Sequence, residues 1–316
     1  MKITIFTPTY NRYYTIQKLF ESLKKQTYTD FEWIVVDDGS TDHTEMFFQG
    51  IKDSFRKFPV LYVKTSNGGK HRAINRALPL ASGEMFFIVD SDDFLPADAL
   101  EQIIHVEATI PSDKKNHFAG ICGQKAHIDS HPVGTTFMQH CEYLDITMLE
   151  REKYQITGDK AEVFYTEILK KYPFPEFDGE NFLTECIVWD KIAYDGYQLR
   201  FFNTPIYYCE YLEDGLTKNQ KRIYEKNPKG YGLYISQCNM FKKYDKAIIN
   251  GMLDEYLRSH KGQYSYPQLA EFLNMPYFSV LWYAFFPYGV MLPLKKFFRK
   301  IFGDKVYEKI KHILGR

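Results

Sequence analysis

Short apolar runs alternate with helix-like segments through the first third of the chain. The runs "ITIFTPT", "FEWIVVDD", "VLYVKTS" and "MFFIVDSDD" are rich in Ile, Val and Phe, as expected of strands. Between the first two, near Tyr14–Gln26, apolar residues recur every three or four positions, which predicts a helix with one buried face. Strands that are apolar at almost every position are typical of a parallel sheet covered by helices on both faces. The pattern predicts an α/β layered domain.

The pattern becomes less regular between Phe118 and Lys171. A strand is expected at "FAGICGQKAHI", and the run "KAEVFYTEILKKY" is interpreted as a helix that begins near Asp159 as its cap. A helical region follows after about Tyr224. We therefore expect an α/β domain with a helical, aromatic-rich C-terminal extension.

Composition narrows the classes of partner and the location. The formal net charge is zero over 316 residues, which argues against nucleic acid as a partner of the whole chain. The five cysteines include no C-x-x-C pair, so neither a disulfide framework nor a zinc site is indicated. The first residues lack a signal-peptide pattern, and we expect a cytoplasmic location.

Polar residues follow three of the predicted strands, at the edge where open α/β sheets bind ligands. The fourth strand is followed by Asp90, Asp92 and Asp93. A helix N-terminus would stabilise each carboxylate by only about 0.3–1 kcal/mol, which offsets little of their repulsion. A hard divalent cation such as Mg²⁺ or Mn²⁺ binds such carboxylates and leaves positions open for phosphate. Ordinary turn and helix-capping roles for these polar residues remain the alternative.

Four motifs in this order resemble glycosyltransferase family 2. They are "TPTYNR" and "VVDDGSTD" at the first two strand ends, "NGGKHRAINRAL" with "ASGE" ahead of the fourth strand, and "VDSDD" after it. A weaker likeness continues through "GENFLTECIVWDKIA". The resemblance implies a GT-A-type fold and a metal cofactor, Mn²⁺ or Mg²⁺.

The resemblance also implies roles for particular residues. Asp38 would bond to the nucleotide base, Asp92 would ligate the metal, and Asp90 would hold the metal or the ribose, with Asp93 nearby. The loop after the first strand would pack on the base and ribose with Thr7, Pro8, Thr9 and Tyr10.

One family feature is absent from the third motif. Ile74 stands before Asn75 where the family usually has Arg, so either Lys70 or Arg72 is expected to supply the positive charge that faces phosphate.

Sugar transfer with inversion also needs a base that accepts the proton of the acceptor hydroxyl. The family places this base in an "ED"-like pair that leads into a helix, and "FDGENFLTECIVWDKIA" has no such adjacent pair. Glu185 precedes the apolar-periodic run and is the base we expect, with Glu180 and Asp190 as rivals. A purely structural role for Glu185 at a helix N-terminus stays open.

The end of the chain indicates a surface contact. Residues 276–294 carry no charge, and residues 295–316 carry eight Lys or Arg against two acidic residues. Pro287, Gly289 and Pro293 disfavour a spanning helix, so residues 276–316 are interpreted as an anchor at an anionic membrane surface. Docking on the catalytic domain or on a second subunit, as in a homodimer, is the alternative.

These inferences define one expected function and two rivals. Residues 1–222 would form the catalytic domain, with a nucleotide-sugar half at 1–100 and an acceptor half at 101–222, and residues 223–316 the helical region. We expect an inverting, metal-dependent transfer of one sugar from a nucleoside-diphosphate sugar, by preference a UDP-sugar, to a glycan or lipid-linked acceptor in cell-surface polysaccharide biosynthesis. With the anchor, the protein would lie at the inner face of the plasma membrane. A sugar-phosphate nucleotidyltransferase and a non-catalytic, membrane-associated scaffold are the rivals.

Overall fold

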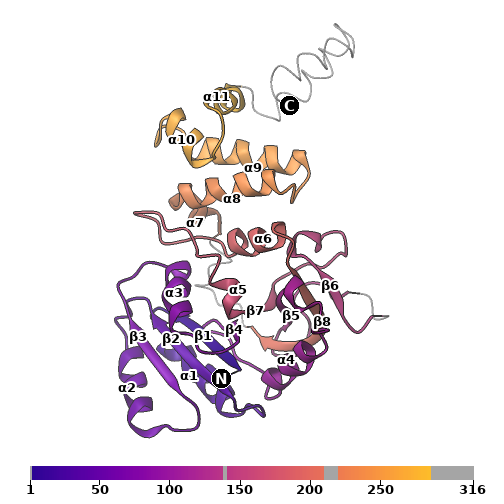
Figure 1. The fold of residues 1–316 in the computed structure, drawn as a ribbon. Helices are drawn as coiled ribbons and strands as arrows, with labels where there is room; N and C mark the ends of the chain where they lie inside the picture. Colours follow the sequence, from indigo (N-terminus) through magenta and orange to yellow (C-terminus); the bar gives the residue numbers. More distant parts are fainter. Residues whose placement is uncertain (1, 138–140, 210–219, 286–316) are drawn as a thin grey trace. The chain divides into compact units, whose positions relative to one another are not determined.

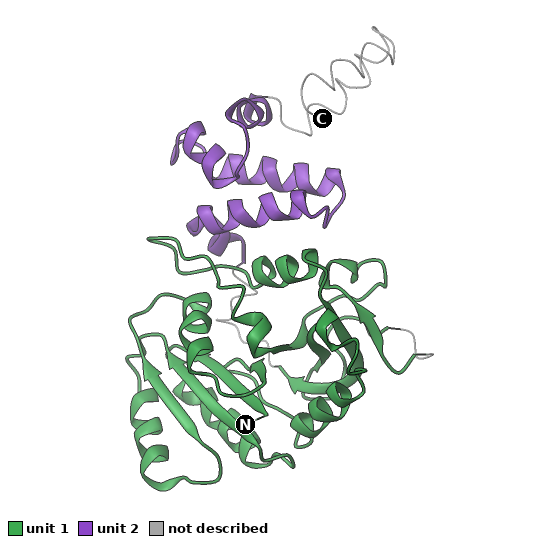
Figure 2. Cartoon of the chain, viewed as in Figure 1, with its two compact units in different colours: residues 1–218 green, residues 219–316 purple. Residues whose placement is uncertain are grey.

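The computed structural model describes residues 2–137, 141–209 and 220–285 (Figure 1). The chain divides into two compact units, residues 1–218 and residues 219–316 (Figure 2). Unit 1 contains the strands together with helices α1 to α6, and the described part of unit 2 is helical.

The described part of unit 1 is organised around an eight-stranded mixed sheet with the order β3-β2-β1-β4-β7-β5-β8-β6. Strands β3, β2, β1 and β4 are mutually parallel, so the predicted parallel layered domain is confirmed for the first third of the chain. The strand predicted at "FAGICGQKAHI" is confirmed as β5. The strands are β1 (Ile3–Thr9), β2 (Phe31–Asp37), β3 (Val60–Lys64), β4 (Met85–Ile88), β5 (Phe118–Ala126), β6 (Leu144–Ile146), β7 (Lys160–Tyr165) and β8 (Gln198–Tyr208).

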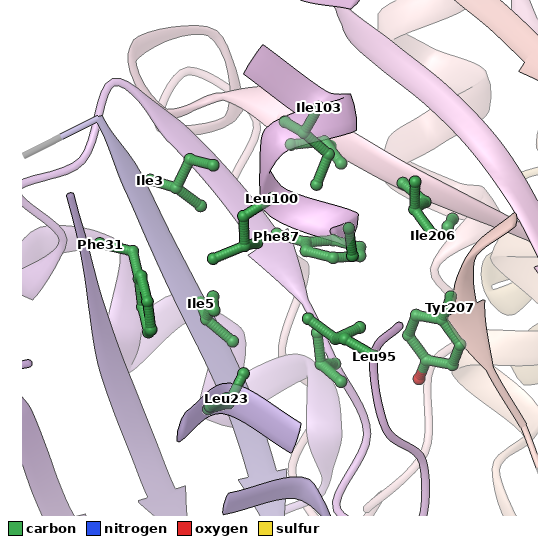
Figure 3. Packing of buried hydrophobic residues seen from close by; sticks show 14 of the residues in the cluster. Ile3, Ile5, Leu23, Phe31, Phe87, Leu95, Leu100, Ile103, Ile206 and Tyr207 are labelled. Carbon is green, nitrogen blue, oxygen red and sulfur yellow. The ribbon is translucent and has the colours of Figure 1, made fainter. Parts of the chain in front are cut away.

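Helices cover both faces of this sheet, as the apolar strands predict. The helix expected near Tyr14–Gln26 is α1, and its residues Ile16, Leu19 and Leu23 are fully buried. They pack with Ile3 and side chains of α2 and α4 in one apolar cluster, part of which is drawn in Figure 3. The helices of unit 1 are α1 (Tyr13–Lys24), α2 (Thr44–Ser54), α3 (Lys70–Ala77), α4 (Ala99–Ala108), α5 (Thr166–Leu169) and α6 (Cys186–Tyr194).

The helix predicted from Asp159 is wrong. Lys160–Tyr165 forms strand β7, which pairs antiparallel with both β4 and β5, and only Thr166–Leu169 is helical. Val163 is buried in the apolar cluster, whereas Phe164 points to the opposite face and packs on Trp189 of α6, with ring centroids 4.3 Å apart. Burial on both faces of the sheet therefore decides the conformation of this run.

Unit 2 has an apolar core of its own. Ile235, Leu253, Leu257 and Leu269 are buried in it, and the hydroxyl of Tyr256 donates to the carbonyl of Pro228 at 2.9 Å. The helical C-terminal region expected from the sequence is therefore present. Its helices are α7 (Gln220–Lys226), α8 (Pro228–Met240), α9 (Lys246–Ser259), α10 (Tyr266–Phe272) and α11 (Tyr277–Phe285).

Candidate active site

The polar strand ends meet at one edge of the sheet because β1, β2 and β4 run parallel. Thr9, the last residue of β1, pairs with Asp37, the last residue of β2. The loops that follow are joined by hydrogen bonds, since the Asn11 side chain accepts from the Thr41 amide at 2.8 Å and the Asn11 amide donates to Ser40 Oγ at 2.8 Å. Hydrogen bonds between these loops thus hold the carboxyl ends of the parallel strands together at one edge of the sheet.

The residues after β1 differ in how accessible they are. Thr7 is fully buried, and its hydroxyl accepts a hydrogen bond from Trp33 Nε1 at 2.9 Å. Thr9 is also buried, but its hydroxyl has no partner among the described residues. Tyr10 is about half exposed and Pro8 is partly exposed. Thr7 therefore supports the core through this bond, and the predicted nucleotide contacts of Thr7, Pro8, Thr9 and Tyr10 stay predictions.

Asp38 anchors the glycine turn ahead of α3. Its carboxylate accepts hydrogen bonds from the amides of Gly68 and Gly69 at 2.8 and 2.7 Å. Burial raises the pKa of Asp38 above its ordinary value, although these two amide bonds act in the opposite direction. Gly69 has a φ of +93°, and a Cβ there would lie 1.9 Å from the carbonyl oxygen of Asn181. The turn that leads to Lys70 therefore requires glycine at this position.

Lys70 joins two of the predicted site residues. Its Nζ lies 2.7 Å from Asp90 Oδ1 and 2.7 Å from Glu185 Oε1. Burial by itself would lower the pKa of Lys70, but the charges of Asp90 and Glu185 outweigh it and raise that pKa. Burial likewise acts to raise the pKa of Asp90, and the charges of Lys70 and Lys125 hold it below its ordinary value. Both partners therefore remain charged at neutral pH.

The three carboxylates of the acidic turn lie in three different environments. Asp90 is paired with Lys70, whereas Asp93 accepts a hydrogen bond from the Tyr207 hydroxyl at 2.7 Å. Burial, and then the charge of Asp90, raises the pKa of Asp93 to about 7. Asp92 has no ion pair among the described residues, and burial followed by the charge of Asp90 raises its pKa. Asp92 is thus the member of the turn that an incoming cation would stabilise most.

The structure separates the three candidates for the base. Glu185 is the residue that caps α6, and its side chain is about one-third exposed. Glu180 and Asp190 are both buried. Of the three, only Glu185 is paired with Lys70 beside the acidic turn.

The donors of Arg72 bond to the chain itself. Its guanidinium donates to the carbonyls of Gly68, Phe177 and Glu180 at 2.6–2.7 Å and lies 3.3 Å from Glu176 Oε2. These bonds fasten α3 to the segment before α6. Of the two residues expected to face phosphate, Lys70 lies beside the acidic turn, whereas the donors of Arg72 are directed at the chain itself. The phosphate contact stays a prediction.

Two residues of the site were not predicted from the sequence. Tyr207 on β8 bonds to the acidic turn, and Lys125 on β5 lies opposite it, with its Nζ 4.2 Å from the centroid of the Tyr207 ring. Lys125 has no ion pair within 4.0 Å in the described ranges, yet its charge acts on Asp90 and Asp93. Neither residue lies in a local motif, so sheet order alone brings them to the site.

The donor set fits a hard divalent cation that is shared with a substrate. In residues 2–137, 141–209 and 220–285 no group of three or more His, Cys, Asp or Glu side chains could enclose a metal. Asp90 and Asp92 supply carboxylate oxygens on one turn, and Mg²⁺ is usually held by one or two carboxylates together with phosphate oxygens and water. The residues therefore suit a metal that reaches full coordination only when a phosphate is bound.

The structure describes the C-terminal segment as far as residue 285. Residues 286–316, which include the basic end, lie outside the described residues. Within the part that is described, no helix combines the length and the apolar character needed to cross a bilayer.

The mostly parallel sheet and the acidic turn are those of a GT-A-type fold, and the comparisons show which family the chain resembles. The model described as Glycosyl transferase family 2 matches residues 4–157. This match spans just under half of the chain, and over these residues it confirms the similarity to glycosyltransferase family 2 that the sequence motifs predict. Among the three classes considered, this result favours the transferase over the nucleotidyltransferase and the scaffold.

Individual relatives are similar over different lengths. Poly(ribitol-phosphate) β-N-acetylglucosaminyltransferase TarS of Staphylococcus aureus is 38% identical over 103 residues, which is 32% of this chain and 18% of that protein. A Campylobacter jejuni GalNAc(5)-diNAcBac-PP-undecaprenol β-1,3-glucosyltransferase is 24% identical over 230 residues, or 71% of each chain. The chain thus spans less than a fifth of TarS.

Solved structures support the fold. The crystal structure of S. aureus TarS with UDP-GlcNAc has a TM-score of 0.55 at 24% identity and covers 82% of this chain and 72% of that one. A Pyrobaculum calidifontis mannosyltransferase in complex with GDP-Man and Mn²⁺ has a TM-score of 0.52 at 19% identity, covering 99% and 84%.

Proposed function

We propose that this chain transfers a single sugar from a nucleoside-diphosphate sugar to a hydroxyl group of a glycan or lipid-linked acceptor, with inversion at the anomeric carbon, and that the reaction needs Mn²⁺ or Mg²⁺. The observation that carries the proposal is the convergence of Lys70, Asp90 and Glu185 at the rim where β1, β2 and β4 end. A cation, a metal-binding turn and a partly exposed carboxylate are the groups that such a transfer requires.

Each residue has a distinct role in this scheme. Asp92 and Asp90 hold the metal, which supplies positive charge to the diphosphate when bound. Glu185 accepts the proton of the acceptor hydroxyl as that oxygen forms its bond to the anomeric carbon and the bond to the diphosphate oxygen breaks. Lys70 orients Glu185 through their ion pair, and its remaining hydrogen is available to a phosphate oxygen.

The donor and acceptor classes rest on the relatives. A UDP-sugar is the donor we favour, since a TarS crystal structure contains UDP-GlcNAc, and Pro8, Thr9, Tyr10 and Asp38 are the candidates for contact with the nucleotide. The names of TarS and of the C. jejuni enzyme specify a poly(ribitol-phosphate) acceptor and an undecaprenol-linked acceptor. These names support a role in cell-surface polysaccharide biosynthesis.

Metal-dependent hydrolysis of UDP-sugars tests the chemistry without knowledge of the acceptor. Native protein should release UDP only with Mn²⁺ or Mg²⁺, and Asp92→Asn should reduce the rate at least 100-fold because the metal loses a ligand. Asp98→Asn, which removes a charge from an exposed residue six positions away, is the matched control and should retain the native rate. Equal rates for native protein and Asp92→Asn would refute the metal site. The base is tested separately with an acceptor, since Glu185→Gln should abolish transfer while leaving donor binding intact.

We also propose that residues 276–316 bind an anionic membrane surface, which would place the enzyme at the inner face of the plasma membrane. Phe278 and Phe285, seven residues apart on α11, are 80% and 68% exposed, and the basic residues 295–316 follow them in the sequence. Apolar side chains beside positive charge are typical of interfacial anchors.

Vesicle sedimentation distinguishes the anchor from a dimer contact. The full chain should bind vesicles that contain phosphatidylglycerol and should not bind pure phosphatidylcholine, and Phe278→Ser with Phe285→Ser should weaken this binding. If the double variant instead changes only the sedimentation coefficient of the protein in solution, these side chains belong to a homodimer interface and the membrane proposal fails.

A further inference from the structure

The end of β8 lies beside the acidic turn, although the two are far apart in the sequence. The Asp90 amide donates to the Tyr207 hydroxyl oxygen at 3.0 Å, and the same hydroxyl donates to Asp93 Oδ2 at 2.7 Å. One oxygen therefore bonds to the residues on both sides of the segment that contains Asp92. Because the hydroxyl has a single hydrogen, which it gives to Asp93, its lone pair is left for the Asp90 amide.

The ring of Tyr207 is held independently of its hydroxyl. It is 1% exposed, it packs edge-on against Phe87 with centroids 6.1 Å apart, and the Lys125 ammonium lies 4.2 Å from its centroid. Figure 3 shows the ring at the margin of the apolar cluster, with its hydroxyl oxygen directed away from Ile206. The core therefore fixes the ring, and the ring in turn fixes the hydroxyl oxygen.

Backbone bonds attach the turn to the sheet on either side of this contact. The Val89 amide donates to the Phe6 carbonyl at 2.8 Å, and Phe94 and Tyr208 exchange two backbone hydrogen bonds of 3.1 and 2.8 Å. Residues 90–93 between these attachments have only one backbone bond within the turn, from the Asp93 amide to the Asp90 carbonyl at 3.2 Å. The orientation of the turn between its two attachments thus depends on the Tyr207 hydroxyl, together with the ion pair that holds the Asp90 side chain to Lys70.

We propose that Tyr207 is a positioning residue for the metal-ligating carboxylates, and that its hydroxyl holds the turn so that Asp90 and Asp92 face the diphosphate in one geometry. The inference rests on the proposed function, because it takes these two aspartates as ligands. It adds a residue from the acceptor half of the sheet to the metal site of the nucleotide half. Groups that orient metal ligands typically contribute 10- to 100-fold to metal affinity, so the effect should be measurable.

The test compares Tyr207→Phe with Tyr208→Phe in the full chain. Tyr207→Phe keeps the buried ring and removes only the hydroxyl. Tyr208→Phe is a matched control, since Tyr208 is half-buried, packs on Phe94 with centroids 5.4 Å apart, and has a hydroxyl with no hydrogen bond in the described part of the chain. Titration calorimetry with Mn²⁺ and UDP measures ligand binding without turnover.

Tyr207→Phe should bind Mn²⁺·UDP about 10-fold or more weakly, and Tyr208→Phe should bind within about twofold of native. In UDP-sugar hydrolysis, the Mn²⁺ concentration for half-maximal rate should rise by the same factor, and excess Mn²⁺ should restore the rate. A purely structural loss would not be rescued by metal. If Tyr207→Phe does not fold, as judged by its thermal transition, Asp93→Ala removes the acceptor of the same hydroxyl and should weaken binding equally.

The outcomes separate this inference from the proposed function. Native binding of Mn²⁺·UDP together with unchanged binding by a folded Tyr207→Phe would overturn the positioning role alone. Absence of metal-dependent binding by the native chain would overturn the proposed function and this inference with it.

Discussion

Replacing Arg72 by Met should loosen unit 1, because the guanidinium and the Asn75 side chain together link α3 to the segment before α6. Arg72 donates to the carbonyls of Gly68, Phe177 and Glu180 and also pairs with Glu176. Its side chain is 13% exposed, so water cannot fully replace these bonds. Methionine fills much of the same volume and removes every donor.

The expected loss follows from the number of bonds and their burial. A hydrogen bond from a charged donor contributes about 1.5–3 kcal/mol, and a buried carbonyl left without a partner costs a similar amount. Three such bonds that share one side chain are not additive, and the exposed Glu176 adds little. We therefore expect a decrease of about 2–4 kcal/mol in the free energy of unfolding of unit 1.

Arg56 provides a matched control. Its guanidinium also donates to three carbonyls, those of Lys52, Asp53 and Phe55, but it is exposed at the end of α2. Arg56→Met should change the free energy of unfolding by no more than about 0.5 kcal/mol, because water can take over its bonds. Urea denaturation followed by tryptophan fluorescence measures the two variants in a Trp282→Phe background, in which the remaining tryptophans, Trp33 and Trp189, both lie in unit 1. Equal small losses for Arg56→Met and Arg72→Met would refute the reasoning, because burial would then make no difference.

Three further substitutions test other contacts. Lys70→Met removes the ammonium group that lies 2.7 Å from both the Asp90 and the Glu185 carboxylate. Without that positive charge the two carboxylates repel each other, so the acidic limb of the pH profile for transfer should move to higher pH. Gly69→Ala should lower the urea midpoint of unit 1 far more than Gly179→Ala, because both glycines have positive φ but only Gly179 has open space for a Cβ. Burial lowers the pKa of His71 to about 4. Between pH 7.5 and pH 5.5, therefore, this histidine takes up a proton in the unfolded chain but not in the folded chain. Over that pH range the free energy of unfolding of native protein should fall by about 1 kcal/mol relative to that of His71→Leu. A pH-independent difference between native protein and His71→Leu would contradict that last expectation.

Local sequence patterns were sufficient to predict the secondary structure of the first third of the chain. Strands β1 to β4 and helix α1 were predicted because buried parallel strands and amphipathic helices each have a characteristic periodicity. The run at Lys160–Tyr165 was misread because its apolar spacing is compatible with both a helix and a strand that is buried on both faces. Its neighbours in the sheet, β4 and β5, decide between the two.

The residues of the candidate site, too, were predictable only where they belong to a local motif. Asp38, Asp90 and Asp92 belong to compact motifs at strand ends and could be located from the sequence. Tyr207 is 117 positions from Asp90 and has no neighbouring motif, so its contact depends on the sheet order. The contacts of Arg72 could not be predicted for a similar reason, because two of its acceptors are backbone carbonyls about 100 residues away, and carbonyls are not marked by residue type.

The late position of β7 in the chain has a practical consequence. This strand joins the edge of β4 to the edge of β5, and the family match at residues 4–157 ends three residues before it begins. A fragment cut at that limit would leave two strand edges with open backbone donors and acceptors, which is a common cause of aggregation. During synthesis, too, the edges of β4 and β5 cannot both be paired until residue 165 has left the ribosome. Expression trials should therefore extend past β7, whatever boundary sequence similarity indicates.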